Sequence, residues 1–145
     1  MSNLFSHPGG CGLCRRKIMK IVKQLAIFLE NQPGALFRVT QDLAKHNINI
    51  NAICVMDSVD HAVVRLIVDK SMEAIHLLGE AGVLVVESDL LEVPLTNAPG
   101  ELNKLCKQLM DKGINIEYAY GSGEGKLYLR LVSPEKALEA LKGSK

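Results

Sequence analysis

The chain has 145 residues and a mass of 15.8 kDa, a length that suits one ordinary domain or two copies of a smaller unit. Hydrophobic residues make up 48% of the chain and charged residues 23%, which is a globular composition. The 17 basic side chains nearly balance the 16 acidic ones, and there are three Phe, three Tyr and no Trp. So few excess cations and so few rings for stacking bases argue against a nucleic-acid partner.

The first residues, 1–18, are expected to form a flexible extension outside the fold. Three basic residues at 15–17 precede an apolar stretch that Lys20 and Lys23 interrupt, without a clean cleavage site, so no secretory signal is predicted. The stretch is also shorter than the roughly 20 apolar residues that span a bilayer, so no membrane partner is expected. We therefore expect a cytoplasmic protein.

The sequence repeats itself at an offset of 66 residues. Pro33-Gly34 recurs as Pro99-Gly100, and nine of the 22 positions from 29 to 50 are identical to those from 95 to 116 without a gap. Further on, Arg65-Leu66 matches Arg130-Leu131 at offset 65, so one copy has a connecting loop one residue shorter. The chain is therefore an internal duplication, and each copy has its own elements.

In chain order, the first copy is expected to form a strand over 23–29, a helix that begins after Pro33-Gly34, strands over 48–56 and 62–68, a helix over 71–80 and a closing strand over 83–87. The second copy is expected to form a strand over 91–95, a helix after Pro99-Gly100, strands over 114–120 and 126–132, and a helix over 134–142. The second copy lacks the closing strand. Because an unpaired sheet edge exposes backbone groups, we expect that edge to be covered, most simply by another chain.

The motif that opens each helix is Asn-x-Pro-Gly-x-Leu, and Ile-Asn-Ile begins the next strand in both copies. This combination resembles the ACT domain, and the resemblance runs from about Met19 to the C-terminus. It implies an α+β fold of two ferredoxin-like βαββαβ units, the second lacking its last strand, with antiparallel sheets and helices on one face. The corresponding domains are 19–89 and 90–145.

The ACT resemblance also implies a function. ACT domains are small, non-catalytic modules that regulate amino-acid metabolism, and they hold a free amino acid between the loop after the first strand and a neighbouring domain. We accordingly expect a sensor of a free amino acid that is not an enzyme, carries no cofactor and forms a homodimer. A further expected partner is an enzyme of amino-acid biosynthesis.

The local chemistry of the two loops suits such a ligand. Backbone N–H groups at a helix N-terminus attract a carboxylate, and glycine lets a ligand approach the main chain. The predicted ligand-binding residues are Asn31, Gln32, Pro33, Gly34, Ala35, Leu36, Asn49 and Ile50 in the first copy, and Asn97, Ala98, Gly100, Glu101, Leu102, Asn115 and Ile116 in the second.

The two loops differ after the glycine, where Ala35 corresponds to Glu101. A carboxylate there either pairs with a ligand ammonium or repels a ligand carboxylate, so the first loop is favoured as the carboxylate-binding one. A purely structural alternative stays open for the whole motif. In that alternative Pro-Gly makes only a tight turn, and Asn49 and Asn115 cap backbone groups at the strand entry.

Two other functions stay open as alternatives. One is a metal-binding or redox protein that uses Cys11 and Cys14 with His7, although the remaining cysteines, Cys54 and Cys106, stand singly and are expected to be buried small residues. The other is a regulatory subunit of a biosynthetic enzyme without a ligand. The glycine-rich segment 121–126 imitates a phosphate loop but lies between two predicted strands, so we expect a flexible hairpin.

Overall fold

The computed structural model describes residues 18–57 and 59–143, so most of the predicted extension, and Cys11, Cys14 and His7 with it, lies outside the described residues. The elements are β1 (Lys20–Glu30), α1 (Ala35–Lys45), β2 (Ile50–Asp57), β3 (His61–Val68), α2 (Ser71–Glu80), β4 (Val85–Pro94), α3 (Glu101–Asp111), β5 (Ile116–Gly121), β6 (Lys126–Leu131) and α4 (Pro134–Lys142). None of the helices in the described part is long and apolar enough to cross a membrane.

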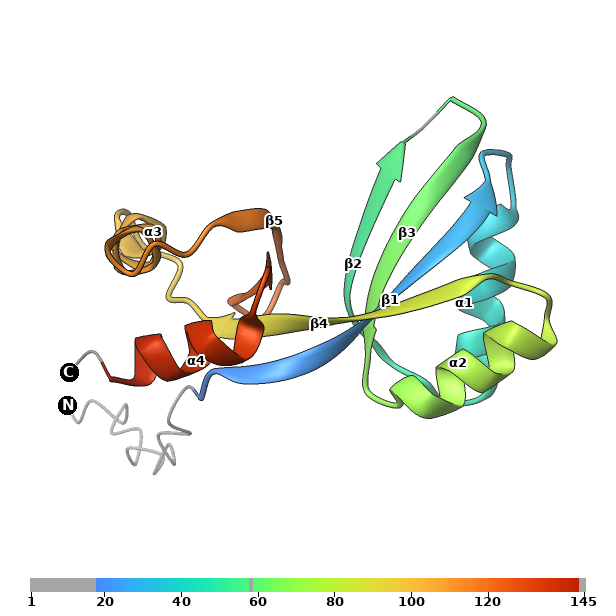
Figure 1. Ribbon diagram of the computed structural model, residues 1–145. Helices are drawn as coiled ribbons and strands as arrows, with labels where there is room; N and C mark the ends of the chain where they lie inside the picture. Colours follow the sequence, from blue (N-terminus) through green and yellow to red (C-terminus); the bar gives the residue numbers. More distant parts are fainter. Residues whose placement is uncertain (1–17, 58, 144–145) are drawn as a thin grey trace, which may run out of the picture.

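The strands form one six-stranded antiparallel sheet in the order β2-β3-β1-β4-β6-β5. The two strands in its centre, β1 and β4, run through both halves of the molecule (Figure 1). We call β2, β3, α1 and α2 the first half, and β5, β6, α3 and α4 the second half. The predicted domain boundary, between residues 89 and 90, lies within β4, which joins the expected strands 83–87 and 91–95 into one.

The second half obtains its closing strand from β1 of the same chain. Residues 25–30 of β1 pair with β3, and residues 20–27 pair with β4, whose residues 91–94 pair with β6. The N-terminal part of β1 thus lies beside the strand that opens the second copy. The expectation that another chain covers this edge was wrong, because β1 begins at Lys20 and is longer than the predicted strand 23–29.

The sequence did not predict that β1 begins as early as Lys20, because lysines are unusual in a central strand. They are tolerated there because acidic side chains lie opposite them on β4. Lys23 Nζ lies 2.9 Å from Asp89 Oδ1 and 3.3 Å from Glu87 Oε1, and Lys20 Nζ lies 3.9 Å from Glu92 Oε1. Opposite charges across neighbouring strands favour this register.

Two hydrophobic cores lie under the helices, one in each half. Leu25 and Ile27 of β1 pack with α1 and α2, whereas Leu91 and Val93 of β4 pack with α3 and α4. Alternate residues of a strand point to one face, so these odd-numbered positions place all four helices on one face of the sheet. This confirms the predicted ferredoxin-like arrangement. Each fully buried leucine contributes about 1.5–3 kcal/mol.

A β-bulge occurs at the same place in both copies. The register shifts between Ile50 and Ala52 in β2 and between Ile116 and Tyr118 in β5, positions related by the 66-residue offset. One extra residue turns the side chains that follow to the opposite face of the sheet. Ile116 therefore packs with the helical core, while Tyr118 and Tyr120 point to the face without helices.

Candidate functional site

The two Asn-x-Pro-Gly loops have the same backbone geometry. Gly34 and Gly100 precede α1 and α3 with φ of 85° and 88°, in the left-handed region that favours glycine. No side chain caps either helix at these positions. The Ala35 and Glu101 N–H groups donate to the Gln32 and Ala98 carbonyls, both at 3.3 Å. The N–H groups that follow them in the first turn of each helix point out of the helix end, where they can donate to an anion.

Each loop is held by the hairpin between the second and third strands of its copy. The Asn31 N–H donates to the Asp60 carbonyl at 3.2 Å, and the Leu95 N–H donates to the Gly125 carbonyl at 2.8 Å. Gly125 has φ of 71°, and a Cβ there would lie 3.1 Å from the Leu95 oxygen. The glycine-rich segment is thus the hairpin turn that the sequence predicted, and its glycine permits a close backbone contact.

A hollow lies beside each loop. The first, of about 480 Å³, is lined by Gln32, Ala35, Arg38 and Asp42 together with the end of α2. The second, of about 500 Å³, is lined by Asn97, Ala98 and Leu102 together with the glycine-rich hairpin. We call them the first and second hollows. Each therefore brings some of the predicted site residues together on one surface.

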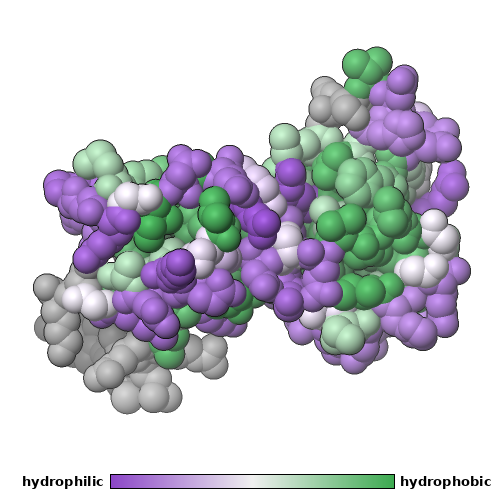
Figure 2. Space-filling view, viewed as in Figure 1, coloured by the Kyte–Doolittle hydropathy of each residue, from purple (hydrophilic) through white to green (hydrophobic). Residues whose placement is uncertain are grey.

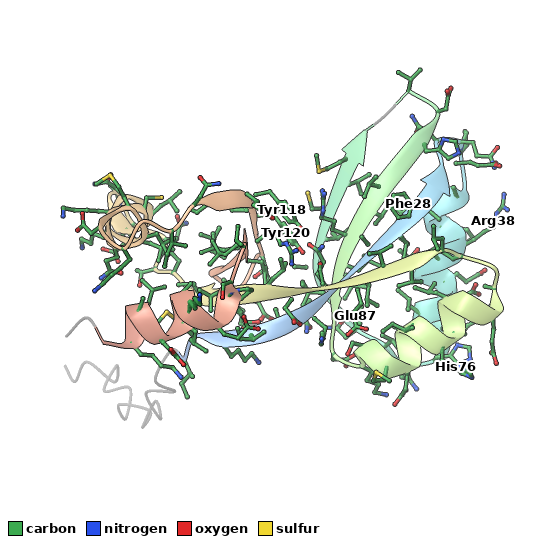
Figure 3. All side chains as sticks on the ribbon, viewed as in Figure 1. Phe28, Arg38, His76, Glu87, Tyr118 and Tyr120 are labelled. Atoms are coloured by element: carbon green, nitrogen blue, oxygen red, sulfur yellow. The ribbon has the colours of Figure 1, made fainter. Side chains whose placement is uncertain are left out.

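The charges of the two loops differ in a way that the sequence only partly indicated. In the second copy Glu101 forms an ion pair with Lys104, at 2.5 Å between Oε1 and Nζ. In the first copy Ala35 and Arg38 stand at the corresponding positions, and Arg38 forms no ion pair with any described residue. Arg38 lies on the outer side of α1, exposed to solvent (Figure 3). The first hollow therefore has a cation that forms no ion pair with an acidic side chain in the described part of the chain.

A single chain does not bring Asn49 and Ile50 to the first loop. Gly34 lies at the N-terminal end of α1 and Asn49 beyond its C-terminal end, and the 11 residues of this helix span about 16 Å. The Asn49 N–H donates to Asp69 Oδ1 at 2.9 Å, and Asn49 Nδ2 donates to Asn51 Oδ1 at 2.8 Å. Asn115 and Ile116 likewise lie beyond the C-terminal end of α3.

A buried polar cluster in the middle of the sheet was missed from the sequence. Gln24 of β1 is 1% exposed. Its Nε2 donates to Ser88 Oγ at 3.1 Å and to Tyr118 Oη at 2.9 Å, and its Oε1 accepts from Tyr120 Oη at 2.9 Å. The one available signal was that Gln24 lies between Val22 and Ala26, the apolar neighbours on its own face of the strand, where a polar side chain requires buried partners.

Tyr120 of this cluster keeps its proton near neutral pH. Burial raises the pKa of Tyr120, and burial also raises the pKa of Tyr128, its neighbour on β6, to about 12. The Tyr120 and Tyr128 rings lie 5.7 Å apart between centroids, and the Arg65 guanidinium lies 4.3 Å from the centroid of the Tyr118 ring. The Tyr120 hydroxyl therefore remains a hydrogen-bond donor to Gln24.

The described residues give the metal and redox alternative no support of their own. They contain no group of three or more His, Cys, Asp and Glu side chains that could hold a metal ion. Cys54 is half-buried, and Cys106 is exposed because it lies outside the buried stripe of α3, which Leu105 and Leu109 form. The expectation that both cysteines are buried was therefore wrong for Cys106 and only partly met by Cys54.

The chain belongs to the family of ACT domain pairs, whose model matches residues 19–144. None of the curated proteins matches the chain in sequence. Among solved structures, it is similar to protein BT0572 from Bacteroides thetaiotaomicron, with 34% identity and a TM-score of 0.78 over 86% of this chain and 88% of that chain.

Two aspartate kinase structures share the fold at lower identity. The regulatory subunit from Thermus thermophilus, in its ligand-free form, is 20% identical with a TM-score of 0.64 over 86% of this chain and 92% of that chain. The regulatory subunit from Thermus flavus is 20% identical with a TM-score of 0.56 over 86% of this chain and 93% of that chain. Both are regulatory subunits, and the shared architecture is the pair of ACT units.

Proposed function

We propose that this chain is a non-catalytic sensor that binds a free amino acid and regulates amino-acid metabolism in the cytoplasm through a partner enzyme. The family of ACT domain pairs and the fold shared with regulatory subunits of aspartate kinase support this proposal. The observation that carries it is the first hollow, where an uncapped helix N-terminus and the cation Arg38 lie together.

The first hollow complements a zwitterion. The ligand carboxylate binds the first-turn N–H groups of α1 and the guanidinium of Arg38, since both favour an anion. Glu30 and Asp42 line the same hollow and attract the ligand ammonium. Phe28, Leu78 and Val83 supply an apolar wall for a side chain. The cation that lines the second hollow, Lys126, forms ion pairs with Glu92 and Glu124, so a carboxylate binds there more weakly.

A second copy of the chain completes this site. Strand β2 forms one edge of the sheet, and its residues from Ile50 to Met56 carry no charge, so its outer backbone groups are free to pair. The first loop contacts the hairpin that follows β2, at the end opposite Asn49. Antiparallel pairing of two β2 strands therefore brings the partner's Asn49 and Ile50 toward the first loop, where a single chain cannot place them.

The edge pairing predicts a strand-specific effect on the dimer. Ile53 of β2 is 42% exposed, and Ala119 is its counterpart on β5, the other edge. A charge on the interface strand repels its symmetry mate, so Ile53→Lys is expected to convert the dimer to a monomer in analytical ultracentrifugation. Ala119→Lys is the matched control and should leave the dimer intact. A dimer that survives Ile53→Lys, or a wild-type monomer, contradicts the pairing.

Thermal melting tests the function itself. The purified protein is melted with each of the twenty free amino acids and with Zn²⁺. At least one amino acid should raise the midpoint, by the equivalent of about 2.7 kcal/mol when its concentration is 100 times the dissociation constant. A shift with Zn²⁺ alone that is lost when the chain starts at Met19 supports the metal alternative, and no shift with any amino acid supports a subunit without ligand.

A further inference from the structure

We propose that Gln24, Tyr118, Tyr120 and Arg65 form a clasp that fixes the angle between the two halves of the sheet and positions the hairpin wall of the second hollow. Tyr118 and Tyr120 come from the edge strand β5 of the second half, whereas Arg65 comes from β3 of the first half. Gln24 lies on β1, the strand that both halves share. Tyr118 and Tyr120 point from the second half toward the first (Figure 3).

The strand order shows that these contacts require a curled sheet. β5 is separated from β1 by β6 and β4, which is roughly 14 Å in a flat sheet with 4.8 Å between strands. That separation exceeds the reach of a tyrosine side chain, yet both hydroxyls lie 2.9 Å from the amide group of Gln24. The helix-free faces of the two halves therefore bend toward each other, and the clasp lies in the bend.

The clasp is unlike an ordinary apolar core because its members have fixed partners. The Gln24 amide uses both of its polar atoms, and Ser88 of β4 accepts its remaining hydrogen bond. If the halves rotate apart, the Gln24 amide loses its two tyrosine partners while it keeps its place on β1 beside β4. A buried polar group without a partner is costly, so one angle between the halves is strongly preferred.

Tyr120 of the clasp directly precedes the turn that lines the second hollow. Tyr120 is followed by Gly121 and the glycine-rich turn, and Gly121, Ser122, Gly123 and Gly125 line that hollow opposite Asn97. Three glycines give this turn little stiffness of its own. Its place is fixed at one end by the Tyr120 bond to Gln24 and at the other by the Leu95 contact with Gly125. Tyr120 is thus a positioning residue for the second hollow.

An apolar surface of the first half lies beside the clasp. Phe28, Met56 and Val63 form one row across β1, β2 and β3 on the helix-free face, and Val86 of β4 follows in the next row. Phe28, Met56 and Val86 are 42%, 47% and 48% exposed. Figure 2 shows apolar residues gathered over the first half. A clasp that opens would widen access to this surface from the side of the second half.

Amide hydrogen exchange on the full-length, ligand-free protein tests the clasp. The double variant Tyr118→Phe/Tyr120→Phe keeps both rings and removes both hydroxyl bonds to Gln24. We expect exchange in residues 118–125 to become roughly 10- to 30-fold faster, which corresponds to two lost hydrogen bonds. The radius of gyration from small-angle X-ray scattering should also rise, because the halves separate.

Tyr128→Phe is the matched control, because Tyr128 is a fully buried tyrosine of the second half with no bond to Gln24. It should change neither the exchange of 118–125 relative to the other strands nor the radius of gyration. If the double variant does not fold, Tyr118→Phe alone should give about a threefold to tenfold effect. The proposal is overturned if exchange in 118–125 stays unchanged, or if it rises only as much as in every other strand. Since no ligand is used, this result is independent of whether the proposed function holds.

Discussion

Replacing Gly34 with valine is expected to weaken amino-acid binding by roughly 10- to 100-fold while the fold persists. The loss is this large because the ligand carboxylate loses a charge-assisted hydrogen bond. Gly34 has φ of 85°, and a Cβ added there meets nothing within 4 Å, so the folded chain has room for the side chain. The left-handed backbone nevertheless costs a β-branched residue about 1–2 kcal/mol. The new side chain also covers the approach to the first-turn N–H groups of α1.

Gly100→Val is the matched control for this prediction. Gly100 has φ of 88° and is equally open, so both variants should lose about the same stability, roughly 1–2 kcal/mol in chemical denaturation. Isothermal titration calorimetry with the amino acid found by melting should then separate them. Because Lys126, the cation that lines the second hollow, forms ion pairs with Glu92 and Glu124, the affinity of Gly100→Val should remain close to that of the wild type. Equal losses of affinity in both variants would place the ligand outside the first hollow.

The whole chain is expected to unfold as one cooperative unit despite its two copies. β1 pairs with β3 of the first half, β4 pairs with β6 of the second half, and β1 and β4 pair with each other, so neither half retains a complete sheet when the other unfolds. Leu66 and Leu131 are corresponding core residues of the two copies, and both are 0% exposed. Leu66→Ala and Leu131→Ala should each cost about 2–5 kcal/mol, and each should shift the unfolding of both halves.

The fluorescence of the tyrosines allows this prediction to be tested. All three tyrosines lie in the second half, at 118, 120 and 128, and the chain has no tryptophan. Tyrosine fluorescence therefore reports on the second half, while far-UV circular dichroism reports on the entire chain. Leu66→Ala lies in the first half, yet it should move both transitions to the same lower denaturant concentration. A fluorescence transition that Leu66→Ala leaves in place would show that the halves unfold independently.

The predicted elements were largely correct because local patterns determine them. The spacing of Leu36, Val39 and Leu43 predicted α1, and Pro-Gly located the start of both α1 and α3. The internal repeat predicted two similar units, and the family match confirms them. The candidate ligand residues were drawn from the same repeats. The structure places some residues of each loop at a hollow but leaves Asn49 and Asn115 at the far ends of α1 and α3.

Other features depend on residues far apart in the chain. Nothing local to Lys20 indicates a strand, and the acidic Glu92 of β4 opposite it helps to make that strand favourable. The bulge at Glu117 has no periodic signal, yet it decides that Tyr118 and Tyr120 turn toward Gln24 and away from the helices. The absence of an ion pair for Arg38 among the described residues likewise depends on the positions of side chains in space.

By itself the sequence determined the duplication, the order of elements and the two glycine-centred helix starts, since turns, caps and amphipathic periodicity arise between residues close in the chain. The tertiary structure decided that one continuous sheet serves both copies, that β1 closes the second copy, and that a buried glutamine joins the two halves. These depend on pairing between strands that lie far apart in the chain, as for Gln24 with Ser88, which are 64 residues apart. Long-range pairing is selected by the free energy of the complete sheet and leaves little trace in any short segment.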